Sequence, residues 1–600
     1  MARELPKRSE VSKEFTWAVE DLYLSVEAWK EDIAKAQGYS DEVAAYAGKV
    51  GACAKNVYEV CRLDEESEKI LNKAFSYASR MSDVDTKNTE NQALVLQIRS
   101  IYMGIASKTA FVVPELLEIP EETLEQYYKE EPGLELYRKM IEEIQRVKAH
   151  RLSAEMEALL AQTAEVTGTP QNVFSMFNNA DVQFPEIEDE NGELVRVTHG
   201  RFVPLLESAN RRVRKDAFQA VYKTYEQFKN TLAAAYSGEV KSRIFKATAR
   251  KYSSTLEAAV DANNVSPDVY KTLVEVINEN LDKMHRYVRL RKKCLGLDEI
   301  HMYDIYTPMV VDSAVKVPFE QAKETILEAL KPLGEDYLAM LKEGFENRWI
   351  DVYENEGKRS GAYSAGAYGC HPFVLLNYAD TLDNEFTLAH EMGHALHSYL
   401  SNQNQPFVYS HYKIFVAEVA STCNEVLLIE HLLANTTDKK ERMYLLNHYL
   451  DSFKGTVYRQ TMFAEYEMIT NAMAERGESL TAEVLKKVYL ELNEKYYGPD
   501  MVSDPEIAIE WARIPHFYYN FYVYQYATGF SAAVAIAHKI LEEGKPAVEN
   551  YKKFLSGGCS ADPVSLLKIA GVDITKKESI QAALDVFGSL LDEMEKLVEE

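Results

Sequence analysis

The chain has 600 residues, and 67 lysines and arginines stand against 94 aspartates and glutamates, so its net charge is −27 at pH 7. This balance argues against nucleic acid as a partner, because a phosphate backbone requires positive charge on the protein. Hydrophobic residues at 46% and charged residues at 27% indicate a folded globular protein, and the length exceeds that of a usual single domain.

Targeting and membrane segments are not evident. Residues 1–23 contain basic side chains but no continuous apolar core, which a secretory signal requires. No stretch approaches the roughly 20 apolar residues of a membrane span. The six cysteines are scattered without C-x-x-C spacing, as is typical of reduced thiols. We therefore expect a cytoplasmic protein that does not bind a membrane and has neither disulfides nor a cysteine metal site.

Helical periodicity dominates the chain. Apolar residues recur at three- and four-residue steps over long runs such as 136–166 and 266–297, with charges on the opposite face. Between them, residues 182–202 predict a hairpin with Asn191-Gly192 at its tip. Gly, Pro and Asn collect just before this hairpin, so we divide the chain near residue 200 into an N-terminal helical domain, 1–200, and a larger domain, 201–600.

Residues 353–381 are rich in Gly, Tyr and small side chains and predict one or two strands. Within them, SAGAYGC (364–370) allows two interpretations. Small side chains let another extended backbone approach and pair with the edge of a strand, and such pairing reads little sequence. Equally, they fit a tight strand packed under a helix.

The next segment, TLAHEMGHALHSYL (387–400), contains the pentapeptide HEMGH. On a helix, His390 and His394 lie four residues apart on one face and present two imidazoles to one metal ion, while Glu391 projects toward a metal-bound water. Zinc fits best, because it accepts nitrogen and carboxylate ligands in a tetrahedral site with one open position. Thr381 is the predicted N-cap. Such a pentapeptide also arises by chance, so a third ligand from another element is needed to support it.

Two features near this helix bear on that third ligand. His397 shares the face of the two histidines, but we expect it to pack or to support a ligand, since a third ligand usually comes from elsewhere. Residues 411–435 predict an amphipathic helix that offers Glu418, Glu425 and Glu430. Glu418 and Glu425 share an apolar face, where a carboxylate requires a partner.

Residues 516–530 are crowded with aromatic side chains. Tyr519 and Tyr526 are seven apart and would share a helical face, which Tyr522 and Tyr524 cannot both join. With 38 tyrosines in the chain, a packing role in the core is the serious alternative for each of them.

The motifs together resemble a known family. HEMGHALH is followed after a short loop by FVAEVAST, and the segments FTWAVEDLY, GKRSGAYSAGAYGCHPFVLLNY and IPHFYYNFYVYQYATG occur in the expected order over nearly the whole chain. In these features the chain resembles the oligoendopeptidase F group of the thimet-oligopeptidase class of zinc metallopeptidases. The resemblance implies a mainly α fold of the zincin type, with a small β-sheet beside the active-site helix and a deep substrate channel.

The resemblance also implies roles for individual residues. His390, His394 and Glu418 would bind one zinc ion per chain, with Glu425 supporting a ligand. His516, Tyr519 and Tyr526 match residues that contact substrate and stabilise the transition state.

We therefore expect an endopeptidase that hydrolyses internal bonds of short peptides, excluding folded proteins, by attack of a metal-bound water with Glu391 as general base. Two alternatives stay open. A zinc carboxypeptidase of similar fold would need a cation for the substrate carboxylate, for which Arg513 is available. A helical peptide-binding protein without activity would carry the motif as a vestige. Side-chain preference and oligomeric state are not predicted.

Overall fold

The computed structural model describes residues 5–310 and 316–600, and most of them are helical. The prediction of a mainly α fold with a few small strands is confirmed. Among the helices of the described residues, none combines the length and the apolar character needed to cross a membrane.

The chain divides into two compact units, each assembled from separate segments. The first comprises Met1–Ala149, Val315–Leu428 and Ile536–Gly571, and the second comprises His150–Ala314, Ile429–Ala535 and Val572–Glu600. The boundary predicted near residue 200 falls inside the first segment of the second unit. These compact units therefore differ from the predicted domains 1–200 and 201–600, each of which is continuous in sequence. The division into those two domains stays a prediction.

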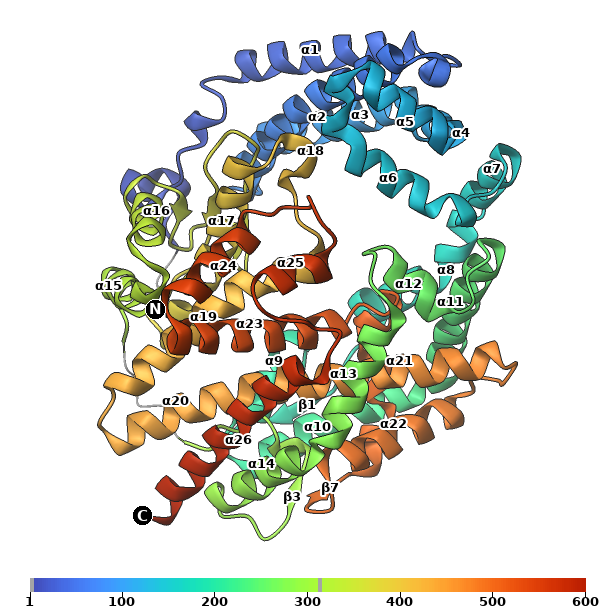
Figure 1. Cartoon of the computed structure of the whole chain (residues 1–600). Helices are drawn as coiled ribbons and strands as arrows, with labels where there is room; N and C mark the ends of the chain where they lie inside the picture. Colours follow the sequence, from blue (N-terminus) through green and yellow to red (C-terminus); the bar gives the residue numbers. More distant parts are fainter. Residues whose placement is uncertain (1–4, 311–315) are drawn as a thin grey trace. The chain divides into compact units, whose positions relative to one another are not determined.

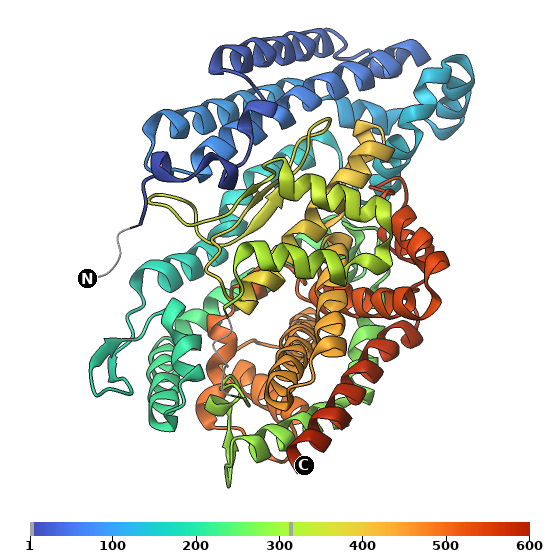
Figure 2. The same ribbon diagram turned by 90° about the vertical axis from the view of Figure 1, so that its left-hand side faces the viewer.

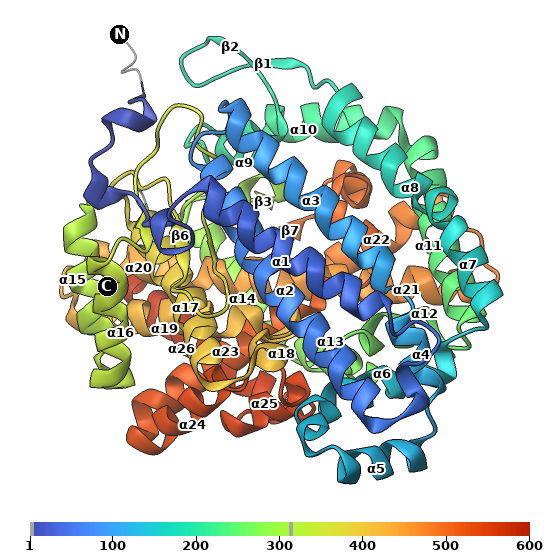
Figure 3. The same cartoon turned by 90° about the horizontal axis from the view of Figure 1, so that it is seen from above.

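The first unit contains a layer of long helices. In Figures 1 and 3, α1 (Val26–Ala44), α2 (Ala54–Asp83) and α3 (Thr89–Thr109) run side by side. The other helices of this unit are α4 (Val112–Glu118), α5 (Glu121–Glu130), α6 (Arg138–Arg146), α15 (Phe319–Ala329), α16 (Glu335–Glu346), α17 (Leu382–Asn404), α18 (Phe407–Ser410), α24 (Lys545–Leu555) and α25 (Pro563–Ile569).

A three-stranded sheet lies under this helical layer (Figure 2). Its order is β4 (Ile350–Asp351), β6 (Phe373–Leu375) and β5 (Tyr363–Ala365); β4 pairs with β6 in parallel and β5 pairs with β6 antiparallel. Side chains of β6 join the apolar core of α1–α3, and β5 and β6 both contact α17. The expected small sheet beside the motif helix is therefore present, with β5 at its edge.

The second unit is almost wholly helical. It contains α7 (Ala154–Gln162), α8 (Ala164–Met176), α9 (His199–Glu207), α10 (Arg211–Gln227), α11 (Lys229–Ala249), α12 (Thr255–Asp261), α13 (Pro267–Glu279), α14 (Leu281–Cys294), α20 (Lys439–Ser452), α21 (Arg459–Glu475), α22 (Ala482–Tyr497) and α26 (Lys577–Glu599). Two further helices, α19 (Ala417–Asn435) and α23 (Tyr524–Glu543), begin in one unit and end in the other.

The predicted hairpin of residues 182–202 is confirmed in the second unit. β1 (Glu186–Glu188) pairs antiparallel with β2 (Leu194–Arg196), and Gly192 between them has a φ of +82°. A side chain at this φ is strained, so glycine suits the turn. A second pair of short strands, β3 (Ile300–His301) and β7 (Met501–Val502), is parallel.

Candidate metal centre and catalytic residues

The motif helix α17 begins where the sequence predicts. The Thr381 side chain accepts a hydrogen bond of 3.2 Å from the backbone N–H of Asn384, which satisfies one of the free donors of the first turn. From this start the helix runs without a break to Asn404, so His390 and His394 stand on one face with ring centroids 4.8 Å apart.

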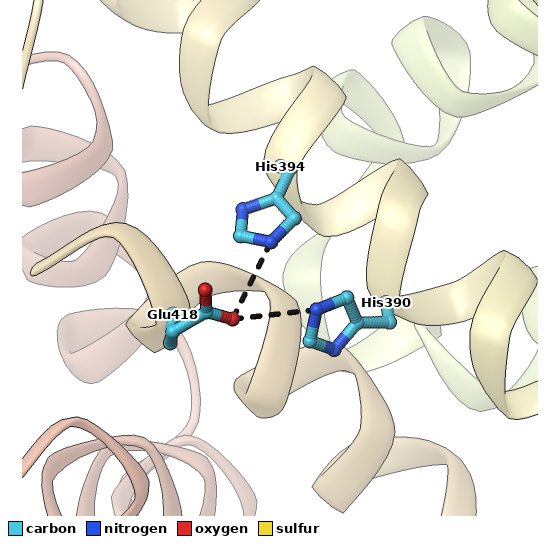
Figure 4. A group of neighbouring side chains, drawn as sticks. All are labelled: His390, His394 and Glu418. Atoms are coloured by element: carbon cyan, nitrogen blue, oxygen red, sulfur yellow. Dashed lines mark ion pairs between the residues drawn. The ribbon is translucent and has the colours of Figure 1, made fainter. Parts of the chain in front are cut away.

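The third group of the centre comes from α19, as Figure 4 shows. Glu418 Oε2 lies 3.3 Å from His390 Nε2 and 3.4 Å from His394 Nε2. Ligand atoms of the three side chains all lie within 4.8 Å of one another. Among the residues that the structure describes, these three form the group that could hold a metal ion. Two imidazoles and one carboxylate are the donor set of catalytic zinc sites, so the residues fit this ion.

The start of α19 explains the position of Glu418. The sequence predicts a helix over the whole of 411–435, and this is wrong at its N-terminal end, because the helix begins at Ala417 after a short 3-10 turn, Ile414–Val416. Glu418 is thereby in the first helical turn, where free N–H groups and the helix dipole favour a negative charge.

A glycine within the motif lets the two helices meet. A Cβ atom on Gly393 would lie 2.6 Å from the Cα of Ser421 and 2.7 Å from the carbonyl oxygen of Ala420. Only a residue without a side chain permits this approach, which brings the first turn of α19 to the histidines. The motif pattern alone does not mark Gly393, and its place between the two histidines is the available signal in the sequence.

Buried hydrogen bonds hold the crossing of α17 and α19. The Asn424 side-chain amide donates to the carbonyl oxygen of Ala389 at 3.1 Å, and its Oδ1 accepts a hydrogen bond from the Tyr337 hydroxyl at 3.1 Å. Asn424 is fully buried, so its loss would leave these groups without partners. Nothing in the sequence distinguished this asparagine from others on α19.

Glu425 orients one of the histidines. Its Oε1 lies 2.5 Å from His390 Nδ1, which leaves Nε2 of the same ring directed at Glu418. A carboxylate on the outer nitrogen fixes the ring orientation and its tautomer, as is common for metal-binding histidines. Glu425 and Glu430 are both outside the group of possible ligands, and Glu430 lies in the part of α19 that belongs to the second unit.

The charges around the centre favour a cation. Burial lowers the pKa of His390, but hydrogen bonds from its ring to Glu418 and Glu425 outweigh burial and raise it to about 10. Burial raises the pKa of Glu418, and the same histidines outweigh this effect and hold it well below its usual range. The two carboxylates therefore favour a positive charge at the ring nitrogens of the histidines. A proton and a divalent cation compete for these nitrogens.

Glu391 is suited to move a proton. Its side chain is only 7% exposed, and its Oε2 is buried and has no hydrogen-bond partner within the described residues. Burial raises the pKa of its carboxyl, while His390 and His394 oppose the rise. A carboxylate with a raised pKa is the better general base near neutral pH.

His397 packs in the interior, which is one of the two roles predicted for it. Its ring stacks on Tyr412 at 3.8 Å between centroids and lies 5.4 Å from Phe554. Burial lowers the pKa of His397 to about 3, so the ring is neutral at physiological pH.

The remaining predicted residues gather in the second unit. The His516 ring lies 5.6 Å from that of Tyr519, 6.0 Å from Tyr526 and 6.5 Å from Tyr522. Tyr524 instead belongs to the core, where its ring lies 4.9 Å from that of Tyr270.

The expected shared helical face of Tyr519 and Tyr526 is wrong. Asn520 and Phe521 have φ values of +52° and +58°, which end the helical path, and α23 begins only at Tyr524. The chain bends between the two tyrosines, and both rings still lie near that of His516. Tyr519 is 48% exposed, whereas His516 is partly buried, and burial lowers the pKa of its ring.

Arg513 does not offer a free cation. Its guanidinium donates to Glu510 at 2.6 Å and to the Tyr222 hydroxyl at 3.3 Å, and it lies over the ring of Phe202. Glu510 also binds Arg459 at 2.8 Å, so the arginines are part of one buried network. The carboxypeptidase alternative therefore loses the anchor on which it depended.

Comparisons with known proteins agree with this geometry. Residues 204–586 match the model of peptidase family M3, and residues 115–184 match the model described as Oligopeptidase F. The chain belongs to peptidase family M3. It is accordingly a metallopeptidase, a hydrolase of peptide bonds.

Relatives of this M3 peptidase extend over its whole length. Oligopeptidase PepF of Bacillus subtilis (strain 168) is 51% identical over 597 residues, covering 100% of this chain and 89% of the relative. Group B oligopeptidase PepB of Streptococcus agalactiae is 41% identical over 98% of each chain. The crystal structure of oligoendopeptidase-F from Enterococcus faecium matches with a TM-score of 0.75 and 41% identity, over 96% of this chain and 99% of the other.

Proposed function

We propose that this M3 peptidase is a zinc-dependent endopeptidase of short peptides. The observation that carries the proposal is the convergence of His390, His394 and Glu418 beside the buried carboxylate of Glu391. The printed names of the relatives, oligopeptidase and oligoendopeptidase, support the same substrate class.

His390, His394 and Glu418 would hold one zinc ion, and Glu425 would orient His390 through Nδ1. When bound, zinc acts as a Lewis acid that polarises the scissile carbonyl and lowers the pKa of water. Glu391 would take the proton of the attacking water and pass it to the leaving amine. This transfer requires a carboxylate that lies close to the water and to the amine and that is readily protonated.

The residues of the second unit would complete the reaction. The hydroxyls of Tyr519 and Tyr526 and the ring of His516 are hydrogen-bond donors that suit the oxyanion of the transition state. Tyr526→Phe should then lower kcat about 100-fold with little change in KM. Tyr522→Phe is the matched control, because its ring contacts His516 and Tyr526 but is not assigned to the oxyanion.

The substrate backbone would pair with β5. This strand is at the edge of its sheet and contacts α17, so an extended peptide added there would run beside the metal ligands. Main-chain pairing recognises little sequence, which suits an oligopeptidase. The deep channel implied by the family resemblance would restrict access to short chains and exclude folded proteins.

An internally quenched peptide of about ten residues, blocked at both ends, tests the proposal. We expect cleavage that stops on chelation and returns with one equivalent of zinc per chain, measured by atomic emission. Glu391→Gln should keep the zinc and lose nearly all turnover, because the base is removed but no ligand. Failure to cleave the blocked peptide, with cleavage of the same peptide carrying a free C-terminus, would establish the carboxypeptidase instead.

A further inference from the structure

An apolar groove of about 690 Å³ opens in the first unit, outside the group of metal ligands. Its walls are side chains of α2 and α3, together with Phe407 of α18 and His411. Glu68 on α2 and Arg99 on α3 are its charged members. The apolar members on which the argument rests are Leu71, Phe75, Tyr102, Met103 and Phe407.

The groove exposes large apolar side chains to solvent. Phe75 is 39% exposed, Tyr102 40% and Met103 69%. Isolated apolar residues at a surface are common, but a cluster that lines a hollow marks a binding site. The carboxylate of Glu68, also in the groove, accepts a hydrogen bond from the Tyr102 hydroxyl at 3.2 Å, and burial raises its pKa. One acidic and one basic side chain line the groove, and the other exposed members are mainly apolar, which favours an apolar occupant.

The groove is continuous with the edge of the sheet. After β5, the chain reaches Tyr368, whose backbone N–H donates to the side chain of Asn72 at 3.4 Å and whose ring packs edge-on against Phe407 at 5.4 Å. Asn72 and Phe407 both line the groove. The segment that follows the edge strand therefore lies against the wall of the groove, three residues beyond Ala365 and at most about 10 Å from it.

We propose that this groove binds an apolar side chain of the peptide substrate, at a position beyond those that pair with β5. The inference rests on the proposed function, because a peptide extended along β5 would bring its next residues to Asn72 and Phe407. Main-chain pairing with β5 does not depend on the peptide sequence. The groove adds a preference for a large apolar or aromatic residue at one position of the peptide, remote from the scissile bond.

A positional scan tests the groove. In a quenched peptide of serine and glycine residues around one cleavable bond, a single phenylalanine replaces serine at each position in turn, and kcat/KM is measured for each peptide. We expect one remote position at which phenylalanine raises kcat/KM about tenfold, the effect of filling an apolar pocket. In the Phe75→Ser and Met103→Ser double variant the gain at this position should fall to nearly one.

Leu96→Ser is the matched control. Leu96 is on the same helix as Met103 and is similarly exposed, 66% against 69%, but it does not line the groove. It should leave the phenylalanine preference unchanged, and all variants should cleave the all-serine peptide at the wild-type rate. A preference that survives in the double variant, or that Leu96→Ser removes equally, would overturn the proposal.

Binding separates failure of the groove from failure of the activity. The same peptides, labelled with a fluorophore, are titrated with the Glu391→Gln enzyme and followed by anisotropy. We expect the phenylalanine peptide to bind about ten times more tightly than the serine peptide. If Phe75→Ser and Met103→Ser, added to the Glu391→Gln enzyme, abolish this difference, the groove is supported even if no peptide is cleaved. A ratio near one at every position overturns it, whether or not the enzyme hydrolyses peptides.

Discussion

Replacement of Gly393 by alanine should damage the metal centre through the backbone, without touching a ligand. The new Cβ would stand 2.6 Å from the Cα of Ser421, whereas carbon atoms in contact need about 3.5 to 4.0 Å. Because the nearest atoms are backbone, α17 and α19 must separate by about 1 Å.

This displacement is large for a metal site. Glu418 is three residues before Ser421 on α19, so it moves with the backbone, while metal–ligand distances tolerate only about 0.2 Å. We expect zinc affinity to fall about 10- to 100-fold, the range seen when groups that position ligands are changed. Overpacking costs about 1–3 kcal/mol of unfolding free energy, and the better helix propensity of alanine returns about 1 kcal/mol. The net change in unfolding free energy should therefore be small, and the loss of zinc affinity is the clearer effect.

Competition with a chromophoric chelator measures the zinc affinity, and thermal unfolding of the metal-free protein measures the stability. Gly104→Ala is the control, because Gly104 is also inside a helix, α3, and a Cβ there meets nothing within 4 Å. It should leave zinc affinity unchanged and be neutral or stabilising by up to about 1 kcal/mol. If Gly393→Ala bound zinc as tightly as the wild type, the crossing of the helices would not determine the position of Glu418.

Other substitutions separate the roles of the carboxylates. Glu418→Ala should lose zinc and activity together, measured by metal content and turnover; full zinc occupancy would contradict its assignment as the third ligand. Glu425→Gln should weaken zinc binding about 10- to 100-fold in the chelator assay, because His390 loses the acceptor that orients it; unchanged affinity would refute that role. Glu385 is 2% exposed, and burial raises its pKa to about 7, so wild-type stability should decline as pH rises from about 4.5 through 7. Glu385→Gln should remove this decline and gain about 3 kcal/mol on the wild type at pH 8 but little at pH 4.5, in unfolding experiments at both pH values; a gain that is the same at both would exclude titration as its cause.

Local rules were sufficient for the parts of the molecule in which neighbouring residues decide the structure. The cap at Thr381 and the four-residue spacing of the histidines follow from helix geometry, and the turn at Gly192 follows from its freedom at positive φ. The pairing of these histidines with Glu418 came from the family resemblance, since Glu425 lies on the same predicted face and was also available by pattern.

The errors arose where tertiary contacts override periodicity. Apolar spacing continues through residues 411–416, yet the helix begins at Ala417, which places Glu418 in its first turn. Likewise, no propensity marks the left-handed backbone of Asn520 and Phe521, and phenylalanine is unusual there. The shared face of Tyr519 and Tyr526 was inferred from a helix that this left-handed backbone interrupts.

The pentapeptide HEMGH shows why a short motif can carry more than its ligands. Besides the two histidines and the base, Met392 is fully buried, and its Cε lies 2.8 Å from where a Cβ on Gly344 of α16 would stand. Gly393 faces α19, as described above. The two motif residues that the metal does not need thus pack against neighbouring helices, Met392 against α16 and Gly393 against α19. A chance pair of histidines on a helix does not require a glycine where that helix crosses α19. Gly393 permits the close crossing that brings Glu418 to the histidines, so its packing is evidence for the metal centre that is independent of the ligands themselves.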